Sequence, residues 1–493
     1  MMGAAMKQYV IGIDIGTTCT KVVVIDEQGN IAGQGSCGYS LMTCADQVEQ
    51  RAEDWINAAQ AAICQATSDL DKSCIKAISC STQGGSTVAL RKDGSFIGNA
   101  WTWMDGRSTE QVEMLNKKLG NEYIYRSTGS RISAALDAAK LPNMKSQTSY
   151  SDARMFLTTL EVINLWLTGN PVIDPSNAAM RQLMNIDKLD WDDSILSTIG
   201  VRRDELPDIL PAGALVGTVT DAVSATTGLP AGIPVYNGAH DQYCASIGAG
   251  AIHAGDMLLS AGTTWVLMGI TEKPMYTESY IVPGRHPIDG LYGAIASLVG
   301  SGTSMEWFRN NLMSADLNIM NEIVPNRMQS TSDLYFYPYV NGAPYPIHNK
   351  AATGVFAGIT LQHDQFDLAR ALMEGVAFGV RRAIADFGQN GAKIESIVMM
   401  GGASKSAAWM QMIASITGVT IKRLNCPDVC AIGAAMIAAC SCGMFQNYSD
   451  AAKAIVSVEQ VYAPVDAEVA YYNEKFEKFD RLWSCLSQFY KGE

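Results

Sequence analysis

The sequence predicts an α/β protein built from two related halves, and three observations support this. The first is the stretch IGIDIGTTCTKVVVID at residues 11–26, where two apolar, β-branched runs flank a short Gly-Thr-Thr turn. The second is the repeat of that design at residues 257–270, MLLSAGTTWVLMGI. The third is an amphipathic helical pattern that follows each copy, at 53–66 and at 368–384. Because the elements recur in the same order, we expect a duplicated fold with a cleft between the copies.

The composition limits the classes of protein to consider. The chain has 493 residues, 48% of them hydrophobic, which is enough for two domains. Its formal net charge of −13 argues against nucleic acid or an anionic membrane as a partner. No apolar span approaches the roughly 20 residues of a membrane helix, and the opening MMGAAMKQYV does not resemble a signal peptide, so we expect a cytoplasmic protein. Twelve cysteines without C-x-x-C pairs favour buried, reduced thiols over a zinc site.

The chain is expected to divide near residues 245–256, just before the second hairpin. We therefore predict an N-terminal domain at 1–248 and a C-terminal domain at 249–493. A long middle stretch at about 110–215 mixes helical patterns with Pro and Asp turns, and it is typical of an insertion on the first half.

The first hairpin carries polar groups that a purely structural turn does not need. Asp14 stands at its base, Thr17 and Thr18 lie in the turn, and Lys21 follows. Backbone N–H groups, hydroxyls and an ammonium suit a phosphate chain, and a strand carboxylate suits a hydrated Mg²⁺. The alternative is that Asp14 is a buried strand residue bonded to its own turn. Burying a carboxylate without a partner is costly, so we favour the metal role.

Asp241 is the candidate general base. It stands in NGAHDQYCASIGAG, where small residues surround one carboxylate and leave space for a substrate. The alternative is that Asp241 caps a helix at 242–247, a position that Asp favours. The sequence position alone leaves both interpretations open.

Two further segments have the composition of ligand-binding loops. The segment 81–108 contains a Gly-rich loop, a hairpin with a Lys-Asp-Gly turn, and then Trp101, Trp103 and Asp105, which alternation places on one face. An aromatic face beside carboxylates suits a polyhydroxylated ligand. The segment 401–418, GGASKSAAWMQMIASITG, opens with glycines before a helix, an arrangement that lets a ligand approach free N–H groups.

Five stretches in this chain resemble motifs of the FGGY family of carbohydrate kinases, which includes xylulokinase, glycerol kinase and gluconate kinase. The similarity runs nearly end to end, and the stretches follow the family's order. They are IGIDIGTTCTK, AWTWMDGRS, LTGNPVIDPSNA, GAHDQ and GGASKSAAWMQMIASITGVTI. The resemblance implies two ribonuclease-H-like domains, as in the actin-like ATPases, which clasp ATP and a sugar between them.

The resemblance also implies roles for individual residues. Asp241 would be the catalytic base that deprotonates the sugar hydroxyl, and Asp14 would hold Mg²⁺ through water. The residues that would contact the sugar are Gln83, Gly84, Gly85, Trp103, Asp105, Asp241 and Gln242. Those that would contact ATP are Thr17, Thr18, Lys21, Gly262, Thr263, Gly302, Glu306, Gly402, Ala403 and Ser406.

The sugar itself is less clearly indicated. Xylulokinases show Met-His-Gly, and glycerol kinases Gln-Arg-Glu, where this chain has Gln83-Gly84-Gly85. A ketopentose such as xylulose is our first expectation, because W-M-D-G-R is closest to the xylulokinase form W-N-D-G-R. A deoxy-ketose, a polyol, an aldonate or the autoinducer-2 precursor is compatible with the same scaffold. Other side chains that could line the sugar pocket are Arg131, Asp137 and Asn177.

Proteins of other classes share this type of fold. Chaperones and filament-forming proteins use it to hydrolyse ATP without phosphorylating a small molecule, and a non-catalytic sugar sensor is a third class. The Trp103–Asp105 motif together with Asp241 favours the kinase. The sequence leaves the oligomeric state open, with a homodimer as one state to consider.

Overall fold

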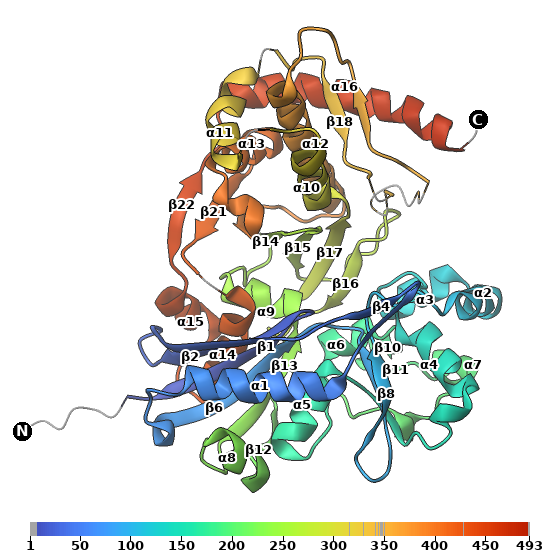
Figure 1. Cartoon of the computed structure of the whole chain (residues 1–493), viewed down its shortest axis with the longest axis vertical. Coiled ribbons are helices and arrows are strands. Elements are labelled where there is room, and N and C mark those ends of the chain that lie inside the picture. The colour runs from blue at the N-terminus through green and yellow to red at the C-terminus, as the bar shows by residue number, and fades with distance from the viewer. Residues whose placement is uncertain are drawn as a thin grey trace, which may run out of the picture. The chain divides into compact units, whose positions relative to one another are not determined.

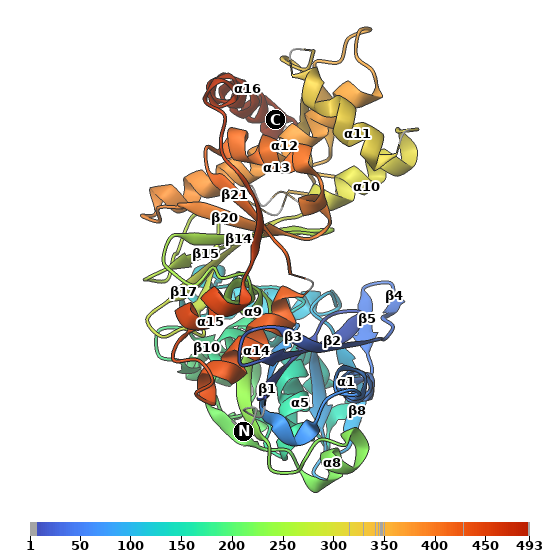
Figure 2. The ribbon, with the colours of Figure 1, turned by 90° about the vertical axis from the view of Figure 1, so that its left-hand side faces the viewer.

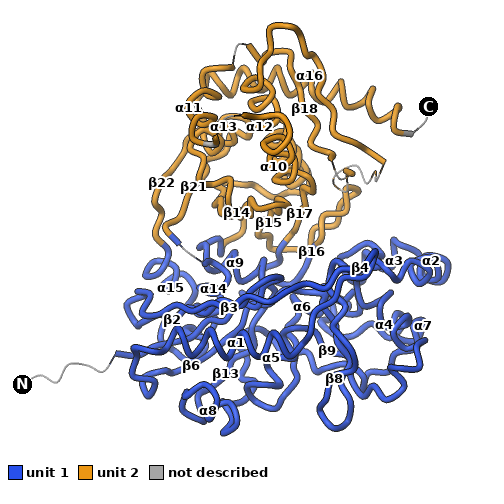
Figure 3. Tube along the Cα trace, viewed as in Figure 1, with its two compact units in different colours: residues 1–252, 283–293, 426–456 blue, residues 253–282, 294–425, 457–493 orange. Residues whose placement is uncertain are grey.

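The computed structural model describes residues 7–491, except 315, 329, 341, 344, 346–348, 350 and 427. Figure 3 shows the two compact units of the chain. Unit 1 comprises residues 1–252, 283–293 and 426–456, and unit 2 comprises 253–282, 294–425 and 457–493. Unit 1 thus includes two segments from the C-terminal half, while the domain boundary at residue 248 stays a prediction.

Unit 1 is built on a six-stranded mixed sheet with the strand order β12-β13-β6-β1-β2-β3. Strands β1, β6 and β13 run parallel, whereas β2 and β3 extend the sheet as an antiparallel meander and β12 pairs antiparallel with β13. In chain order the strands are β1 (Tyr9–Ile15), β2 (Cys19–Asp26), β3 (Ile31–Gly38), β6 (Ile75–Thr82), β12 (Leu215–Thr218) and β13 (Pro234–His240). The three parallel strands therefore end at one edge of the sheet.

Helices cover both faces of this sheet (Figure 1). On one face, α1 (Ala52–Ala66) and α5 (Thr159–Thr168) bury the side chains of alternate β1 residues, among them Ile11 and Ile13. On the other face, α9 (Asp241–Gly248) and α14 (Val429–Ser441) pack together against β1 and β6. The predicted helix at 53–66 is confirmed.

The inserted segments of unit 1 form a second layer of structure. A five-stranded sheet has the order β4-β5-β8-β7-β9, and its β7–β8 hairpin confirms the predicted Lys-Asp-Gly turn. Its strands are β4 (Met42–Cys44), β5 (Gln47–Gln50), β7 (Thr87–Leu90), β8 (Phe96–Trp101) and β9 (Met155–Thr158). The small β10–β11 pair is Met184–Asn185 with Asp190–Trp191. The other helices are α2 (Thr109–Lys118), α3 (Asn121–Thr128), α4 (Asp137–Ser146), α6 (Pro175–Met180), α7 (Asp193–Ile199), α8 (Asp221–Thr227) and α15 (Tyr448–Ile455).

Unit 2 has a seven-stranded sheet with the order β16-β17-β15-β14-β20-β21-β22. Figure 2 shows α12 and α13 on one side of this sheet. The strands are β14 (Asp256–Ala261), β15 (Trp265–Thr271), β16 (Val282–Arg285), β17 (Tyr292–Leu298), β20 (Ser396–Met400), β21 (Thr420–Leu424) and β22 (Val458–Tyr462), with a separate pair β18 (Tyr335–Tyr337) and β19 (Val355–Ala357). The helices are α10 (Ser301–Asn311), α11 (Leu317–Ile323), α12 (Gln365–Gln389), α13 (Ala407–Thr417) and α16 (Asp466–Lys491).

The two main sheets share one plan, which confirms the predicted duplication. In unit 2, β14 pairs antiparallel with β15 and parallel with β20, and β20 pairs parallel with β21. These relations match those of β1 with β2 and β6, and of β6 with β13, in unit 1. The Gly-Thr-Thr turns thus occupy equivalent places, each between the first two strands of its sheet. Within the described residues, no helix is long and apolar enough to cross a membrane.

The cysteine prediction holds in part. The twelve cysteines are all free, in keeping with reduced thiols. Only three of them are buried, namely Cys74, Cys80 and Cys244, while Cys44 and Cys485 are exposed. The other seven are partly buried, so the expectation of buried thiols is wrong only for the two exposed cysteines and holds in part for these seven.

Glycines let α9, α14 and β1 approach one another backbone to backbone. A Cβ atom placed on Gly12 of β1 would lie 1.9 Å from the carbonyl oxygen of Ala431 in α14. A Cβ on Gly433 of α14 would lie 1.8 Å from the carbonyl oxygen of Cys244 in α9. Real Cβ atoms never come so close, so only glycine fits at these crossings. This packing fixes where α9 and α14 begin relative to the end of β1.

We predict that Gly433→Ala lowers the free energy of unfolding by about 1–3 kcal/mol, because the added methyl group must push two helix backbones apart. Urea unfolding followed by circular dichroism measures this. Gly388→Ala in α12 is the matched control, since a Cβ there meets nothing within 4 Å. Equal stability of the two variants would contradict the packing described for α9 and α14.

Candidate active site

Asp14 lies buried near the end of β1, at the edge where the three parallel strands of unit 1 end. Ser81 of β6 donates its hydroxyl hydrogen to Asp14 Oδ1 at 2.6 Å. Asp14 is therefore bonded to the neighbouring strand, and the alternative that it bonds its own turn is wrong. Burial, followed by repulsion from Asp428 and Asp241, raises the pKa of Asp14 to about 8. A carboxylate in this setting is stabilised by a nearby cation.

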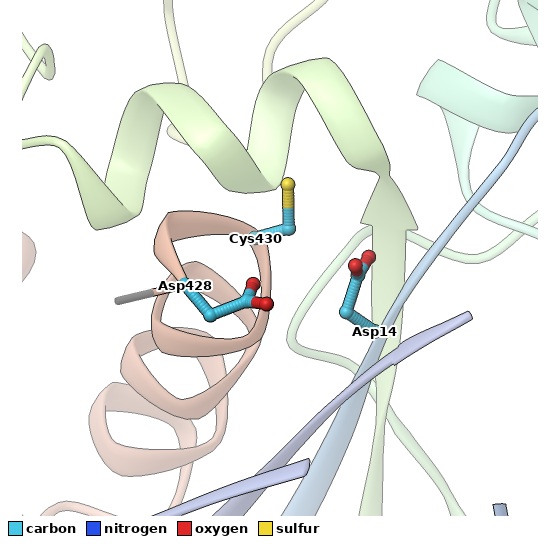
Figure 4. A group of neighbouring side chains, drawn as sticks. All are labelled: Asp14, Asp428 and Cys430. Carbon is cyan, nitrogen blue, oxygen red and sulfur yellow. The ribbon is translucent and has the colours of Figure 1, made fainter. Parts of the chain in front are cut away.

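Asp428 and Cys430 lie at the start of α14 and face Asp14 (Figure 4). One potential ligand atom from each of the three residues lies within 4.8 Å of the others. Lys21 Nζ pairs with Asp428 Oδ2 at 2.7 Å, so the predicted phosphate-binding ammonium is held beside this cluster. The sequence analysis missed Asp428 and Cys430, because only the fold brings α14 to β1.

The Gly-Thr-Thr turn of unit 1 is held by side chains from three other segments. Tyr39 donates to the carbonyl oxygen of Gly16 at 2.5 Å, and Gln50 Nε2 donates to that of Thr17 at 2.6 Å. Trp103 Nε1 donates to Thr17 Oγ1 at 3.3 Å. The turn is thus fixed from outside, while Thr18 is exposed at its tip. No sequence signal pointed to Gln50, although it also contacts the loop that follows β6.

Asp241 is the first residue of α9 and follows directly on β13. The helix cap is His240, whose Nδ1 accepts the Gln242 N–H at 3.4 Å, so the alternative that Asp241 is the cap is wrong. Asp241 Oδ1 lies 3.3 Å from the same Nδ1. Because that nitrogen accepts a hydrogen bond, it does not donate to Oδ1, and within the described residues this buried oxygen has no hydrogen-bond partner. The side chain as a whole is 29% exposed.

The loop after β6 brings Gln83, Gly84 and Gly85 to the same edge of the sheet. The backbone N–H of Gln83 donates to the carbonyl oxygen of Ile15 at 2.9 Å, and its side-chain amide donates to Gln50 Oε1 at 2.9 Å. Gly85 has a φ of +68°, a left-handed conformation that glycine adopts most readily. The loop therefore lies directly beside the end of β1 and its turn.

Lys140 of α4 holds this loop through hydrogen bonds to backbone carbonyl oxygens. Its fully buried ammonium donates to the carbonyl oxygens of Gly85 at 2.7 Å, Trp101 at 3.0 Å and Thr102 at 2.6 Å. Burial lowers the pKa of Lys140 to about 8, while nearby Asp137 acts in the opposite direction. One cation thus joins two of the segments that the sequence predicts to bind the sugar.

Trp101, Trp103 and Asp105 do not share one face, so that prediction is wrong. Strand β8 ends at Trp101, and a turn follows in which the Asp105 N–H donates to the Thr102 carbonyl oxygen at 3.0 Å. Trp103 is 45% exposed, whereas Asp105 is fully buried. Asp105 accepts from the guanidinium of Arg107 and from the Val48 N–H. The turn interrupts the alternation of side chains that a continuous strand would give.

The other residues predicted to bind the sugar lie in unit 1, and their side chains differ in exposure to solvent. Asp137 is fully buried and pairs with Arg181 at 2.5 Å. Asn177 is buried and bonded to Asp174, while Gln242 is partly buried at the start of α9. Arg131 is exposed, and its carbonyl oxygen accepts from Gln182.

Unit 2 contains a cavity of about 560 Å³ at its own Gly-Thr-Thr turn. All the ATP-binding residues predicted in this unit line it, namely Gly262, Thr263, Gly302, Glu306, Gly402, Ala403 and Ser406. Ser406 caps α13 and donates to Asn321 Oδ1 at 2.5 Å. Side chains that the sequence analysis did not single out, including Arg309, Asn318 and Asn321, complete the lining. The cavity combines a glycine-rich turn with helix N-termini, which suits a nucleotide with phosphates.

Comparison with known proteins identifies the family. The model of the FGGY family of carbohydrate kinases, N-terminal domain, matches residues 9–248, and that of the C-terminal domain matches 257–442. The chain belongs to the FGGY family of carbohydrate kinases. It is 26% identical to the xylulose kinase of Bacillus subtilis over 97% of both chains. Gluconate kinase from Lactobacillus acidophilus superposes with a TM-score of 0.93 and 27% identity over 99% of both chains.

Xylulose kinase from Lactobacillus acidophilus superposes with a TM-score of 0.91 and 27% identity over 98% of this chain and 99% of that one. This FGGY kinase thus has the two ribonuclease-H-like domains of the actin-like ATPases, as the resemblance implied. It is a phosphotransferase that uses ATP to phosphorylate a sugar hydroxyl.

We predict that Lys140→Met lowers the free energy of unfolding by about 1–3 kcal/mol and raises the KM for the sugar. Three carbonyl oxygens would lose their shared donor, and the loop at Gly85 would lose its link to Thr102. Urea unfolding and steady-state kinetics measure the two effects. Lys117→Met, at an exposed position of α2, is the control and should change neither. A stable variant with an unchanged KM would show that Lys140 does not organise the loop.

Proposed function

We propose that Asp241 is the general base of this carbohydrate kinase and takes the proton from the sugar hydroxyl that is phosphorylated. The observation that carries the proposal is the buried Oδ1 of Asp241, which has no hydrogen-bond partner among the described residues. A buried carboxylate oxygen without a donor is unfavourable, and the hydroxyl of a bound sugar would supply the missing hydrogen. The position at the start of α9, beside the end of β1, also suits a base at a ligand-binding edge.

We further propose that the sugar contacts Gln83, Gly84, Gly85, Trp103 and Gln242 of unit 1. The partly exposed indole of Trp103 offers an apolar face to the ring or chain carbons of a sugar. We propose that Asp105, which is fully buried, acts on the sugar site indirectly. Its carboxylate accepts hydrogen bonds from Arg107 and from the Val48 N–H, and it thereby holds the turn that carries Trp103.

Mg²⁺ is the metal that we propose for the Asp14 cluster. Asp14 interacts electrostatically with Asp428 and Asp241, and Lys21 pairs with Asp428 at 2.7 Å. A divalent cation would relieve this repulsion, and Mg²⁺ needs only one or two carboxylates together with waters. Asp14 would hold the ion through water, with Asp428 beside it. Bound there, Mg²⁺ would neutralise charge on the transferring phosphate.

The cavity of unit 2 is the nucleotide site that we propose. Gly262, Thr263 and Gly302 would meet the phosphates, and Gly402, Ala403 and Ser406 the nucleoside, with Glu306 at the cavity wall. In unit 1, Thr17 and Thr18 of the first Gly-Thr-Thr turn and Lys21 of β2 are proposed to contact phosphate. In terms of domains, we propose that residues 1–248 bind the sugar and residues 249–493 bind the nucleotide.

The reaction then follows from positioning and proton transfer. The sugar oxygen attacks the γ-phosphorus of ATP, the bond from that phosphorus to the β-phosphate oxygen breaks, and ADP leaves. Asp241 takes the hydroxyl proton as the new P–O bond forms. Exclusion of water from the site would limit the wasteful reaction in which water, in place of the sugar, accepts the phosphoryl group.

A ketopentose such as xylulose is the substrate that we propose. The W-M-D-G-R stretch and the similarity to xylulose kinases support it. An aldonate is the second candidate, because the gluconate kinase structure superposes equally well.

Use of ATP and the free thiols suit a cytoplasmic location, and a homodimer is the oligomeric state to test.

We predict that Asp241→Asn lowers kcat by about 100- to 10,000-fold, because the amide cannot accept the hydroxyl proton. The melting temperature should stay near that of the wild type, since no described hydrogen bond to Oδ1 is lost. A coupled assay of ADP formation and a thermal melt measure the two. The exposed Asp152→Asn is the matched control. Turnover near the wild-type rate in the Asp241 variant would refute the base assignment.

We predict that ATP consumption depends on an added sugar and that kcat/KM is highest for a ketopentose. A panel of ketopentoses, deoxy-ketoses, polyols, aldonates and the autoinducer-2 precursor, assayed with Mg-ATP, tests this. A higher kcat/KM for gluconate would assign the aldonate class instead. An ATPase rate that ignores every sugar would overturn the proposed function.

A further inference from the structure

The imidazole ring of His240 fills the space that a side chain at residue 84 would occupy. A Cβ atom placed on Gly84 would lie 2.5 Å from His240 Cδ2 and 2.9 Å from His240 Nε2. The next nearest atom, Met180 Cβ, is 3.2 Å away. Residue 84 must therefore be glycine for this ring to take its place, and the Nε2 edge of the ring lies against the loop that is proposed to bind the sugar.

The two ring nitrogens of His240 have different surroundings. Nδ1 accepts the Gln242 N–H as the cap of α9, which places the hydrogen of the neutral ring on Nε2. Among the described residues, Nε2 has no hydrogen-bond partner. This nitrogen is also not fully shielded from solvent. The ring as a whole is only 9% exposed. A nearly buried donor that keeps an accessible N–H is suited to a ligand.

A backbone hydrogen bond and a ring contact hold His240 at the end of β13. The His240 N–H donates to Ser176 Oγ at 2.9 Å, and the Ser176 hydroxyl donates to Asp174. The ring also makes an edge contact with Tyr243, with centroids 6.1 Å apart. Asp241 follows in the chain, and its Oδ1 lies 3.3 Å from Nδ1. The free Nε2 edge and the proposed base are therefore fixed together.

We propose that His240 is a sugar-binding residue whose Nε2–H donates to an oxygen of the bound sugar, and that Gly84 makes room for the ring. This inference rests on the proposed function of Asp241. The donor that the xylulokinase pattern carries at residue 84 is here supplied from residue 240.

A double-mutant cycle tests the steric part. Gly84→Ala should lower the melting temperature and raise the KM for the sugar at least about fivefold, because the methyl group displaces the ring. In a His240→Ala background the ring is absent, so the same Gly84→Ala change should cost less in both quantities. Gly388→Ala is the control for a harmless added methyl group. An equal cost of Gly84→Ala in both backgrounds, or no cost in either, would overturn the inference.

Two amide variants test which nitrogen meets the sugar. The side-chain nitrogen of Gln reaches the place of Nε2, and that of Asn the place of Nδ1. We expect His240→Gln to keep the KM within about threefold of the wild type and His240→Asn to raise it about tenfold, the loss of one hydrogen bond. His253→Ala, at an exposed histidine, should change nothing. A KM that is the same in the Gln and Asn variants would overturn the inference.

The outcomes also separate this inference from the proposed function. Absence of sugar-dependent turnover in the wild-type chain would overturn the proposed function and the inference with it. An active wild type with additive Gly84 and His240 effects would overturn the inference alone. The melting temperatures report on the packing of the ring in either case.

Discussion

The candidate active site of unit 1 depends on the contact between the backbones of α9, α14 and β1. Glycines at the crossings, among them Gly12 and Gly433, leave no side chain between these elements. The starts of both helices are thereby drawn to the end of β1, where Asp241 and Asp428 meet Asp14. Close packing of these backbones thus brings negative charges together, and burial followed by this charge raises the pKa of Asp14.

A second network connects the loops of unit 1 through single side chains. Gln50 donates to Thr17 and accepts from Gln83, so it joins the phosphate-type turn to the loop after β6. Trp103 also reaches Thr17, and Lys140 ties the far side of the loop to the strand before Trp103. The sugar-side and phosphate-side groups of this unit are therefore joined in one hydrogen-bonded network, which favours a preorganised site.

The sequence correctly predicted the structural elements that depend on local periodicity. The hairpins, the helix at 53–66 and the duplication follow from alternation and helical spacing, which neighbouring residues determine. Asp428, Gln50 and the ring of His240 could not be found in this way, because their partners are distant in the chain. The turn after Trp101 was missed, since the residues that impose it lie on another strand. The unit 2 cavity was anticipated through resemblance, whereas the contacts of its lining residues were not.

The common plan of the two sheets has a consequence for how such an enzyme changes over evolutionary time. The shared strands supply the two turns, while the five-stranded sheet and its helices are inserted between strands of one copy only. Within this insertion, Gln50 and Trp103 both bond the turn at Thr17. Substitutions elsewhere in the insertion can alter the surroundings of the sugar-side loop while the pairing of β1 with β2, which carries the turn, is kept.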